Sequence, residues 1–68
     1  MAWILKRHRK GKVQILYDDY GMGEEWLSPV HSNLLPAVFK TKYEADFERK
    51  VCERMEPDYE YEVTEYLR

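Results

Sequence analysis

One segment of the sequence constrains the fold more than any other, because residues 41–56 combine the start, the periodicity and the end of a single helix. Thr41 and Glu44 form a capping box, in which the threonine oxygen accepts a hydrogen bond from the backbone N–H three residues on. Pro57 ends the helix, since the residue before a proline avoids helical geometry. Between these limits, large apolar residues recur every four positions, which predicts that this stripe packs on a sheet. The stripe consists of Tyr43, Phe47, Val51 and Met55.

The segments on either side of this helix alternate with a period of two. After the helix, Tyr59, Tyr61 and Val63 alternate with polar residues, which is typical of a strand. Before it, the first seventeen residues predict a β-hairpin, and residues 24–30 predict a short third strand. The predicted fold class is therefore α+β: an N-terminal β-hairpin, a short third strand, one helix packed on the sheet and a C-terminal strand. The 68 residues form a single domain, 1–68.

The turn of the hairpin decides which side chains share a face. A two-residue turn at residues 10–11 would mix charged side chains into both faces. A three-residue loop over 9–11 pairs His8 with Lys12 and gives Gly11 a left-handed position. We favour this second register, because a buried face fixes the register of a strand. It gathers on one face Trp3, Leu5, Val13, Ile15 and Tyr17, and on the other Lys6, His8, Lys12 and Gln14.

The chain has little capacity for catalysis. So short a chain uses most of its apolar residues on one core and has few left to wall a deep pocket. His8, His31 and Cys52 are its only imidazole and thiol groups, and their spacing is not the short paired spacing of zinc sites. No glycine-rich phosphate loop is present. We therefore expect a protein that is not an enzyme and has no cofactor and no metal.

Two further features indicate a compartment. The single cysteine cannot form an internal disulfide, which argues against a secreted disulfide scaffold. No apolar run approaches the ~20 residues that a membrane helix needs, and the first charges follow the apolar N-terminus rather than precede it. We expect a soluble, cytoplasmic protein with no membrane contact.

The net charge of −2 conceals a bipolar layout. Residues 1–17 carry five cations and no acid, and the remaining residues carry six cations and thirteen acids, so the two parts are +5 and −7. A basic hairpin can contact nucleic-acid phosphates, although hairpin tips often carry cations only for solubility. The nucleic-acid candidates are Lys6, Arg7, Arg9, Lys10 and Lys12.

The acidic part offers a second candidate surface. Asp58, Glu60 and Glu62 lie on one face of the predicted last strand, at ~6.8 Å intervals. Such a line of carboxylates can engage a basic groove on a protein that normally holds nucleic acid, although it is also the ordinary solvated face of a strand. Tyr20 and Met22, in a glycine-containing loop, are further partner-binding candidates.

A single helix covers only one face of a sheet. In the favoured register Ile4 and Leu16 lie on the other face, so a homodimer through that face is an open alternative.

Three short features, taken with the aromatic, acidic last strand, carry a resemblance. Trp26, the run Ala37-Val38-Phe39-Lys40-Thr41 and the pair Glu44-Ala45 resemble small ββαβ proteins encoded by phages and prophages. The resemblance covers most of the chain and implies a protein that binds a host protein.

These observations favour one function over another. The leading hypothesis is a non-catalytic binding protein, phage-derived, that inhibits or modulates a host macromolecule by occupying one of its surfaces. The alternative is a small nucleic-acid-binding regulator that uses the basic hairpin from Lys6 to Lys12.

Overall fold

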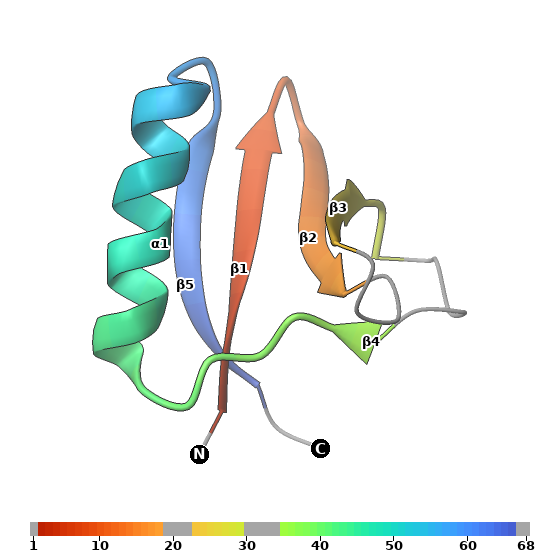
Figure 1. Ribbon diagram of the computed structural model, residues 1–68. Helices are drawn as coiled ribbons and strands as arrows, with labels where there is room; N and C mark the ends of the chain where they lie inside the picture. The colour runs from red at the N-terminus through yellow and green to blue at the C-terminus, as the bar shows by residue number, and fades with distance from the viewer. Residues whose placement is uncertain (1, 19–22, 30–34, 67–68) are drawn as a thin grey trace.

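The computed structural model describes residues 2–18, 23–29 and 35–66. A single helix packs on one face of an antiparallel sheet of five strands, which confirms the predicted α+β class (Figure 1). The strand order is β3-β2-β1-β5, and β4 pairs with β2. The elements are β1 (Ala2–Arg9), β2 (Lys12–Asp18), β3 (Glu24–Leu27), β4 (Leu35–Pro36), α1 (Lys42–Met55) and β5 (Glu60–Tyr66). Tyr20 and Met22 lie outside the described residues.

The hairpin turn is shorter than the sequence predicted. Arg9 lies opposite Lys12, so Lys10 and Gly11 form a two-residue turn and the predicted three-residue loop is wrong. Both turn residues have positive φ, 50° for Lys10 and 77° for Gly11, as a type I′ turn requires. The left-handed position predicted for Gly11 is confirmed.

Arg7 explains why this register is stable. Counting back from the turn, Arg7 lies opposite Gln14, and its side chain is buried at 8% exposure on the face that packs against the helix. The sequence argument rejected this register because it mixes charged side chains into both faces of the hairpin. A guanidinium can occupy such a position when aromatic rings stack on it and its N–H groups find acceptors, and Arg7 has both.

The new register exchanges the faces of β2 relative to β1. Leu5 and Leu16 now share the core, together with Ala37 from the crossing segment and Ala45 from the helix. Ile4, which points to the opposite face of β1, is also buried. The prediction that Ile4 and Leu16 lie on an open sheet face is therefore wrong.

A short segment fills the space where β1 and β2 diverge. Trp3 and Phe39 exchange two backbone hydrogen bonds, of 3.0 and 2.8 Å, and Ala37 donates to the Leu16 carbonyl at 2.9 Å. The chain from residue 35 to 39 thus joins both strands before it turns into the helix, as the crossing between β4 and α1 shows in Figure 1.

The helix begins and ends where the sequence predicted. Thr41 is the N-cap, and its hydroxyl oxygen accepts a hydrogen bond from the Glu44 N–H at 3.1 Å. The backbone N–H of Glu56 closes the last turn on the Cys52 carbonyl, and Pro57 follows. The face that packs on the sheet is not the predicted one, however. Its only buried residue is Ala45, and the stripe that includes Phe47 faces outward, so the prediction that Phe47 packs on the sheet is wrong.

Candidate functional site

The outer face of α1 carries an unusual concentration of exposed apolar surface. The exposed fractions are 80% for Tyr43, 62% for Phe47, 41% for Val51 and 78% for Met55. Residues four apart on a helix form one continuous ridge, so these side chains adjoin one another along the outer face. We call these four residues the helix ridge. A small domain rarely leaves so many large apolar side chains together in water without a use for them.

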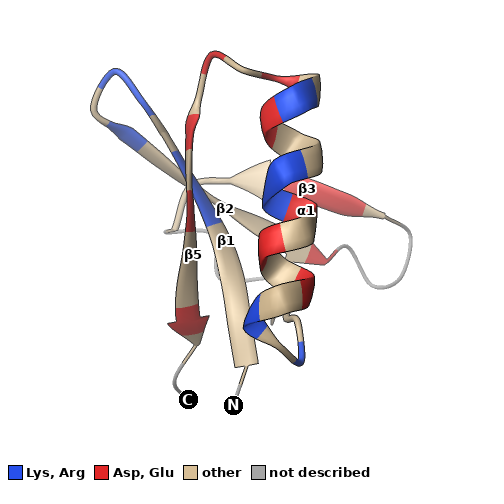
Figure 2. Cartoon of the chain, turned by 90° about the vertical axis from the view of Figure 1, so that its left-hand side faces the viewer, with Lys and Arg blue, Asp and Glu red and all other residues tan. Residues whose placement is uncertain are grey.

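Charged residues border the helix ridge asymmetrically. Each residue turns the helix by about 100°, so the residue after a ridge position lies on one side and the residue before it on the other. The side that follows the ridge holds Glu44 and Glu48, which we call the acidic edge. The side that precedes the ridge holds basic residues, which we call the basic edge. Figure 2 shows acidic segments in red and basic segments in blue along α1. The basic edge consists of Lys42, Lys50 and Arg54, all exposed.

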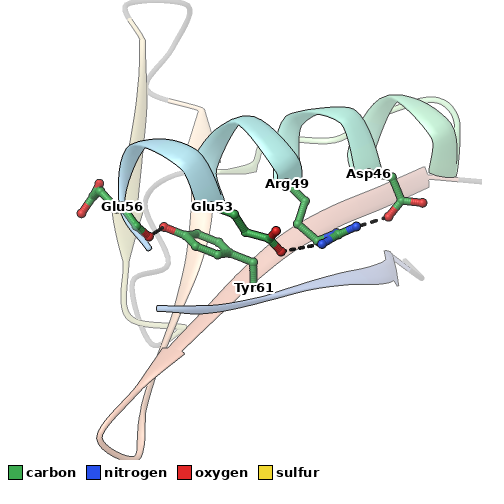
Figure 3. A network of polar contacts seen from close by, with 5 residues as sticks. All are labelled: Asp46, Arg49, Glu53, Glu56 and Tyr61. Atoms are coloured by element: carbon green, nitrogen blue, oxygen red, sulfur yellow. Dashed lines mark hydrogen bonds and ion pairs between the residues drawn. The ribbon is translucent and has the colours of Figure 1, made fainter. Parts of the chain in front are cut away.

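One acid, Asp46, also lies on the basic side, but an arginine engages it. Arg49 Nε donates to Asp46 at 3.4 Å, and Arg49 Nη1 donates to Glu53 one turn further on (Figure 3). This row of three charges runs along the helix between the ridge and the sheet. All three charges belong to α1 itself, so the row stabilises the helix locally.

The C-terminal end of the helix is fastened to the sheet by polar contacts rather than by apolar packing. Tyr61 of β5 donates its hydroxyl to the Glu56 carbonyl at 2.8 Å (Figure 3). A phenol is protonated at neutral pH in any case and can donate, and burial raises the pKa of Tyr61 further. Arg7 Nη1 reaches the Glu56 carboxylate at 3.4 Å. The ridge side chains take no part in these polar contacts.

Arg7 is the centre of an aromatic cluster under this end of the helix. Its guanidinium carbon lies 4.6 Å from the ring centroid of Trp26 and 3.9 Å from that of Tyr59. Its Nε donates to the Gln14 side chain at 2.7 Å, and Trp26 meets Tyr61 edge to face at 5.8 Å. Arg7 therefore belongs to the core, and it is removed from the predicted nucleic-acid surface.

The other predicted cations divide between the tip and the strand. Lys6 is half-buried in β1, directly opposite Glu62 of β5. The tip residues Arg9, Lys10 and Lys12 are exposed, and they line a hollow of about 530 Å³ together with Tyr59. Tyr59, which is distant from these cations in the sequence, has its ring centroid 5.4 Å from the guanidinium carbon of Arg9.

The predicted acidic line is exposed but has basic neighbours. Glu62 lies opposite Lys6 and contacts His8 at 3.2 Å, and Glu60 lies opposite His8. Asp58, just before β5, lines a hollow together with Arg9, Lys10 and Gly11 of the hairpin. The two charged regions that the sequence separates by fifty residues are thus adjacent strands of one sheet.

Two observations concern metal binding and nucleophilic chemistry in the part of the chain that the structure describes. No group of three or more histidine, cysteine or carboxylate side chains is placed there to hold a metal ion. Cys52 is half-buried, and burial, followed by the nearby Glu48 and Glu24, raises the pKa of its thiol. A thiol held protonated in this way is a poor nucleophile.

Two further findings concern membrane-spanning helices and the similarity of the chain to known proteins. Within residues 2–18, 23–29 and 35–66, no helix is long and apolar enough to cross a bilayer. The chain matches no protein-family model, no curated protein and no solved structure.

Proposed function

We propose that this chain is a non-catalytic protein-binding domain and that the helix ridge is its contact surface. The observation that carries this proposal is the exposure of four large apolar side chains in one row, Tyr43, Phe47, Val51 and Met55. Burying such a row against a partner removes apolar area from water, which is the main driving force of association. Recognition through helical anchors at this spacing is a common mode of protein binding.

The way the helix is attached supports the same proposal. Its sheet side is built from Ala45 with half-buried polar residues, so the large apolar residues are not needed for the fold. A helix that keeps its small residue inside and its large ones outside is expected to gain its remaining stability from a partner.

A finer version of the proposal adds the kind of partner that the sequence led us to expect. In that version the partner is a host macromolecule, and the chain inhibits or modulates it by occupying one of its surfaces. Asp58, Glu60 and Glu62 would then steer association with a basic partner, because exposed charges act mainly on the rate of encounter.

Photo-cross-linking from the ridge tests the proposal directly. Benzoylphenylalanine replaces Phe47 in cells that produce the protein, and the same amino acid replaces Glu25, which is exposed on β3, as a matched control. We expect a cross-linked product from position 47 and none from position 25. Mass spectrometry of that product identifies the partner. Equal cross-linking from both positions, or none from position 47, would refute the ridge as a contact surface.

A second candidate function is nucleic-acid binding by the hairpin tip. The observation that favours it is Tyr59, which supplies beside Arg9 the stacking platform that single-stranded nucleic acid uses. Arg9, Lys10 and Lys12 are exposed and would contact phosphates.

Mobility shifts of single-stranded DNA and RNA at two salt concentrations test this second candidate. Three phosphate contacts predict a slope of log K against log salt of about −2. The double variant Lys10→Glu, Lys12→Glu should abolish the shift, and Lys40→Glu, an exposed lysine outside the tip, should leave most of it. Binding that the double variant retains would exclude the tip.

A further inference from the structure

We propose that the occupant of the helix ridge is a second copy of this chain, bound about a twofold axis with the two helices running in the same general direction. This inference rests on the proposed function, because it names the partner of the same surface. Its basis is the arrangement of charge beside the ridge. The acidic edge, Glu44 and Glu48, lies on one side, and the basic edge, Lys42, Lys50 and Arg54, lies on the other.

A surface with one acidic and one basic edge is complementary to itself in one of two twofold arrangements. When the axis runs along the ridge, rotation brings the acidic edge of one copy against the basic edge of the other, on both sides of the interface. When the axis runs across the ridge, acidic meets acidic and basic meets basic. Opposite charges across an interface favour the first arrangement, and like charges disfavour the second.

The positions along the helix agree with the first arrangement. Lys50 is two residues beyond Glu48, and Lys42 is two residues before Glu44, so each acid has a lysine of the partner about 3 Å away along the axis. Asp46, the one acid on the basic side, is engaged by Arg49 and offers less repulsion to the partner's acids. The acidic edge therefore meets cations at both of its positions.

The ridge itself suits this pairing. About an axis along the ridge, Phe47 meets its own symmetry mate at the centre, with Tyr43 and Met55 toward the two ends. Aromatic anchors at the centre of an interface contribute most to its stability. The dimer places both sheets on the outside, so the two domains do not collide.

The other apolar surface discussed for a dimer does not compete with the ridge. Ile4 and Leu16 are each 5% exposed, and burial within the chain leaves them little surface to offer a second copy. Among the described residues, Leu35 and Val38 are also exposed apolar side chains, but they line a separate hollow with Pro36 and Tyr66.

A charge-exchange experiment tests both the partner and the arrangement. Sedimentation equilibrium of the purified chain should show a concentration-dependent dimer. Glu48→Lys sets a cation against Lys50 of the second copy, and Lys50→Glu sets an acid against Glu48 of the second copy, so each variant alone should dimerise at least about tenfold more weakly. An equimolar mixture of the two should regain the affinity, because every facing pair is again opposite in charge. Phe47→Ser should weaken the dimer and remain folded.

A matched control separates this effect from general attraction between charged proteins. Glu25→Lys and Lys12→Glu change the net charge by the same amounts at exposed sites away from α1. Each should dimerise like the parent, and mixing them should change nothing. A chain that is monomeric at all concentrations up to about 1 mM overturns the proposal. So does a dimer that the mixture of Glu48→Lys with Lys50→Glu fails to restore.

The result is distinguishable from failure of the proposed function. A monomer in the centrifuge, combined with a cross-link from position 47 to a different protein, overturns the dimer and leaves the ridge as a binding surface. A monomer with no cross-link from position 47 overturns both.

Discussion

The guanidinium carbon of Arg7 lies 3.9 Å from the ring centroid of Tyr59, a residue beyond the far end of the helix. This contact joins the first strand to the turn that follows α1, and Trp26 closes the other flank at 4.6 Å. The positive charge thus connects three parts of the chain, because the planar guanidinium offers both a stacking surface and directed donors.

Arg7→Lys should destabilise the protein although it keeps the charge. An ammonium cannot stack between Tyr59 and Trp26 while it donates to Gln14, so we expect a loss of about 1–2 kcal/mol in the free energy of unfolding. Urea denaturation followed by tryptophan fluorescence measures this loss. Arg9→Lys, at the exposed tip, is the control and should change the free energy by less than about 0.5 kcal/mol. Equal losses at both positions would contradict the buried role of Arg7.

Leu5→Ala and Phe47→Ala should differ sharply in how much each lowers the free energy of unfolding. Leu5 is fully buried, and its truncation should cost about 2–5 kcal/mol, which is comparable with the stability of so small a domain. Phe47→Ala removes an exposed side chain and should cost less than about 1 kcal/mol when the protein is dilute enough to be monomeric. Circular dichroism melts at low protein concentration compare the two. A Phe47→Ala chain that is unfolded would show that this side chain belongs to the core after all.

The hairpin turn should respond to substitutions according to its positive φ angles. Gly11→Ala should cost about 1 kcal/mol through backbone strain alone, since an added Cβ meets nothing within 4 Å. Lys10→Asn should stabilise the protein by about 0.5 kcal/mol, because asparagine tolerates the left-handed region better than lysine. Lys12→Asn makes the same chemical change within a strand and should not stabilise. No stabilisation at position 10, or equal stabilisation at positions 10 and 12, would contradict the two-residue turn.

Glu24→Gln should stabilise the protein at neutral pH and lose this effect in acid. Burial, followed by the charges of Glu48 on α1 and Asp18 on β2, raises the pKa of Glu24. A carboxyl group with a raised pKa binds its proton more tightly in the folded state, so its ionised form costs stability above that pKa and none below the unfolded value. The gain in Tm should therefore be present at pH 7 and shrink toward pH 4. Glu25→Gln, on the opposite face of β3, is the control, and a gain independent of pH would contradict this origin.

The helix and the last strand could be predicted because their signals are local. The Thr41 cap, the limit at Pro57 and the alternation around Tyr61 depend on residues within one or two turns of each other. The hairpin and the short third strand are confirmed for the same reason, although β3 ends at Leu27 rather than at residue 30.

The register of the hairpin and the buried face of the helix could not be predicted from pattern alone. Both errors came from treating every large apolar residue as inside and every charge as outside. Arg7 is a charged residue that is buried, because its guanidinium stacks on Trp26 and Tyr59, which are distant in sequence. Phe47 is a large apolar residue that is exposed, because the small residue Ala45 is the one that faces the sheet and allows the helix to approach it closely. The alternation of Arg7 with Trp3 and Leu5 was the one local signal of its inward position.

The pairing of Ala2 with Tyr66 sets the order of events during synthesis. β1 lies between β2 and β5, so the strand made earliest lacks one neighbour until the strand made last has left the ribosome. At about 5–20 residues per second, roughly 3–10 s separate the end of β1 from the start of β5. Throughout that time one edge of the nascent hairpin remains unpaired, and an unpaired edge is a template for other chains. The sheet can therefore be completed only after β5 has been made, and a nascent chain stalled before residue 60 would offer the edge of β1 to any strand in its vicinity.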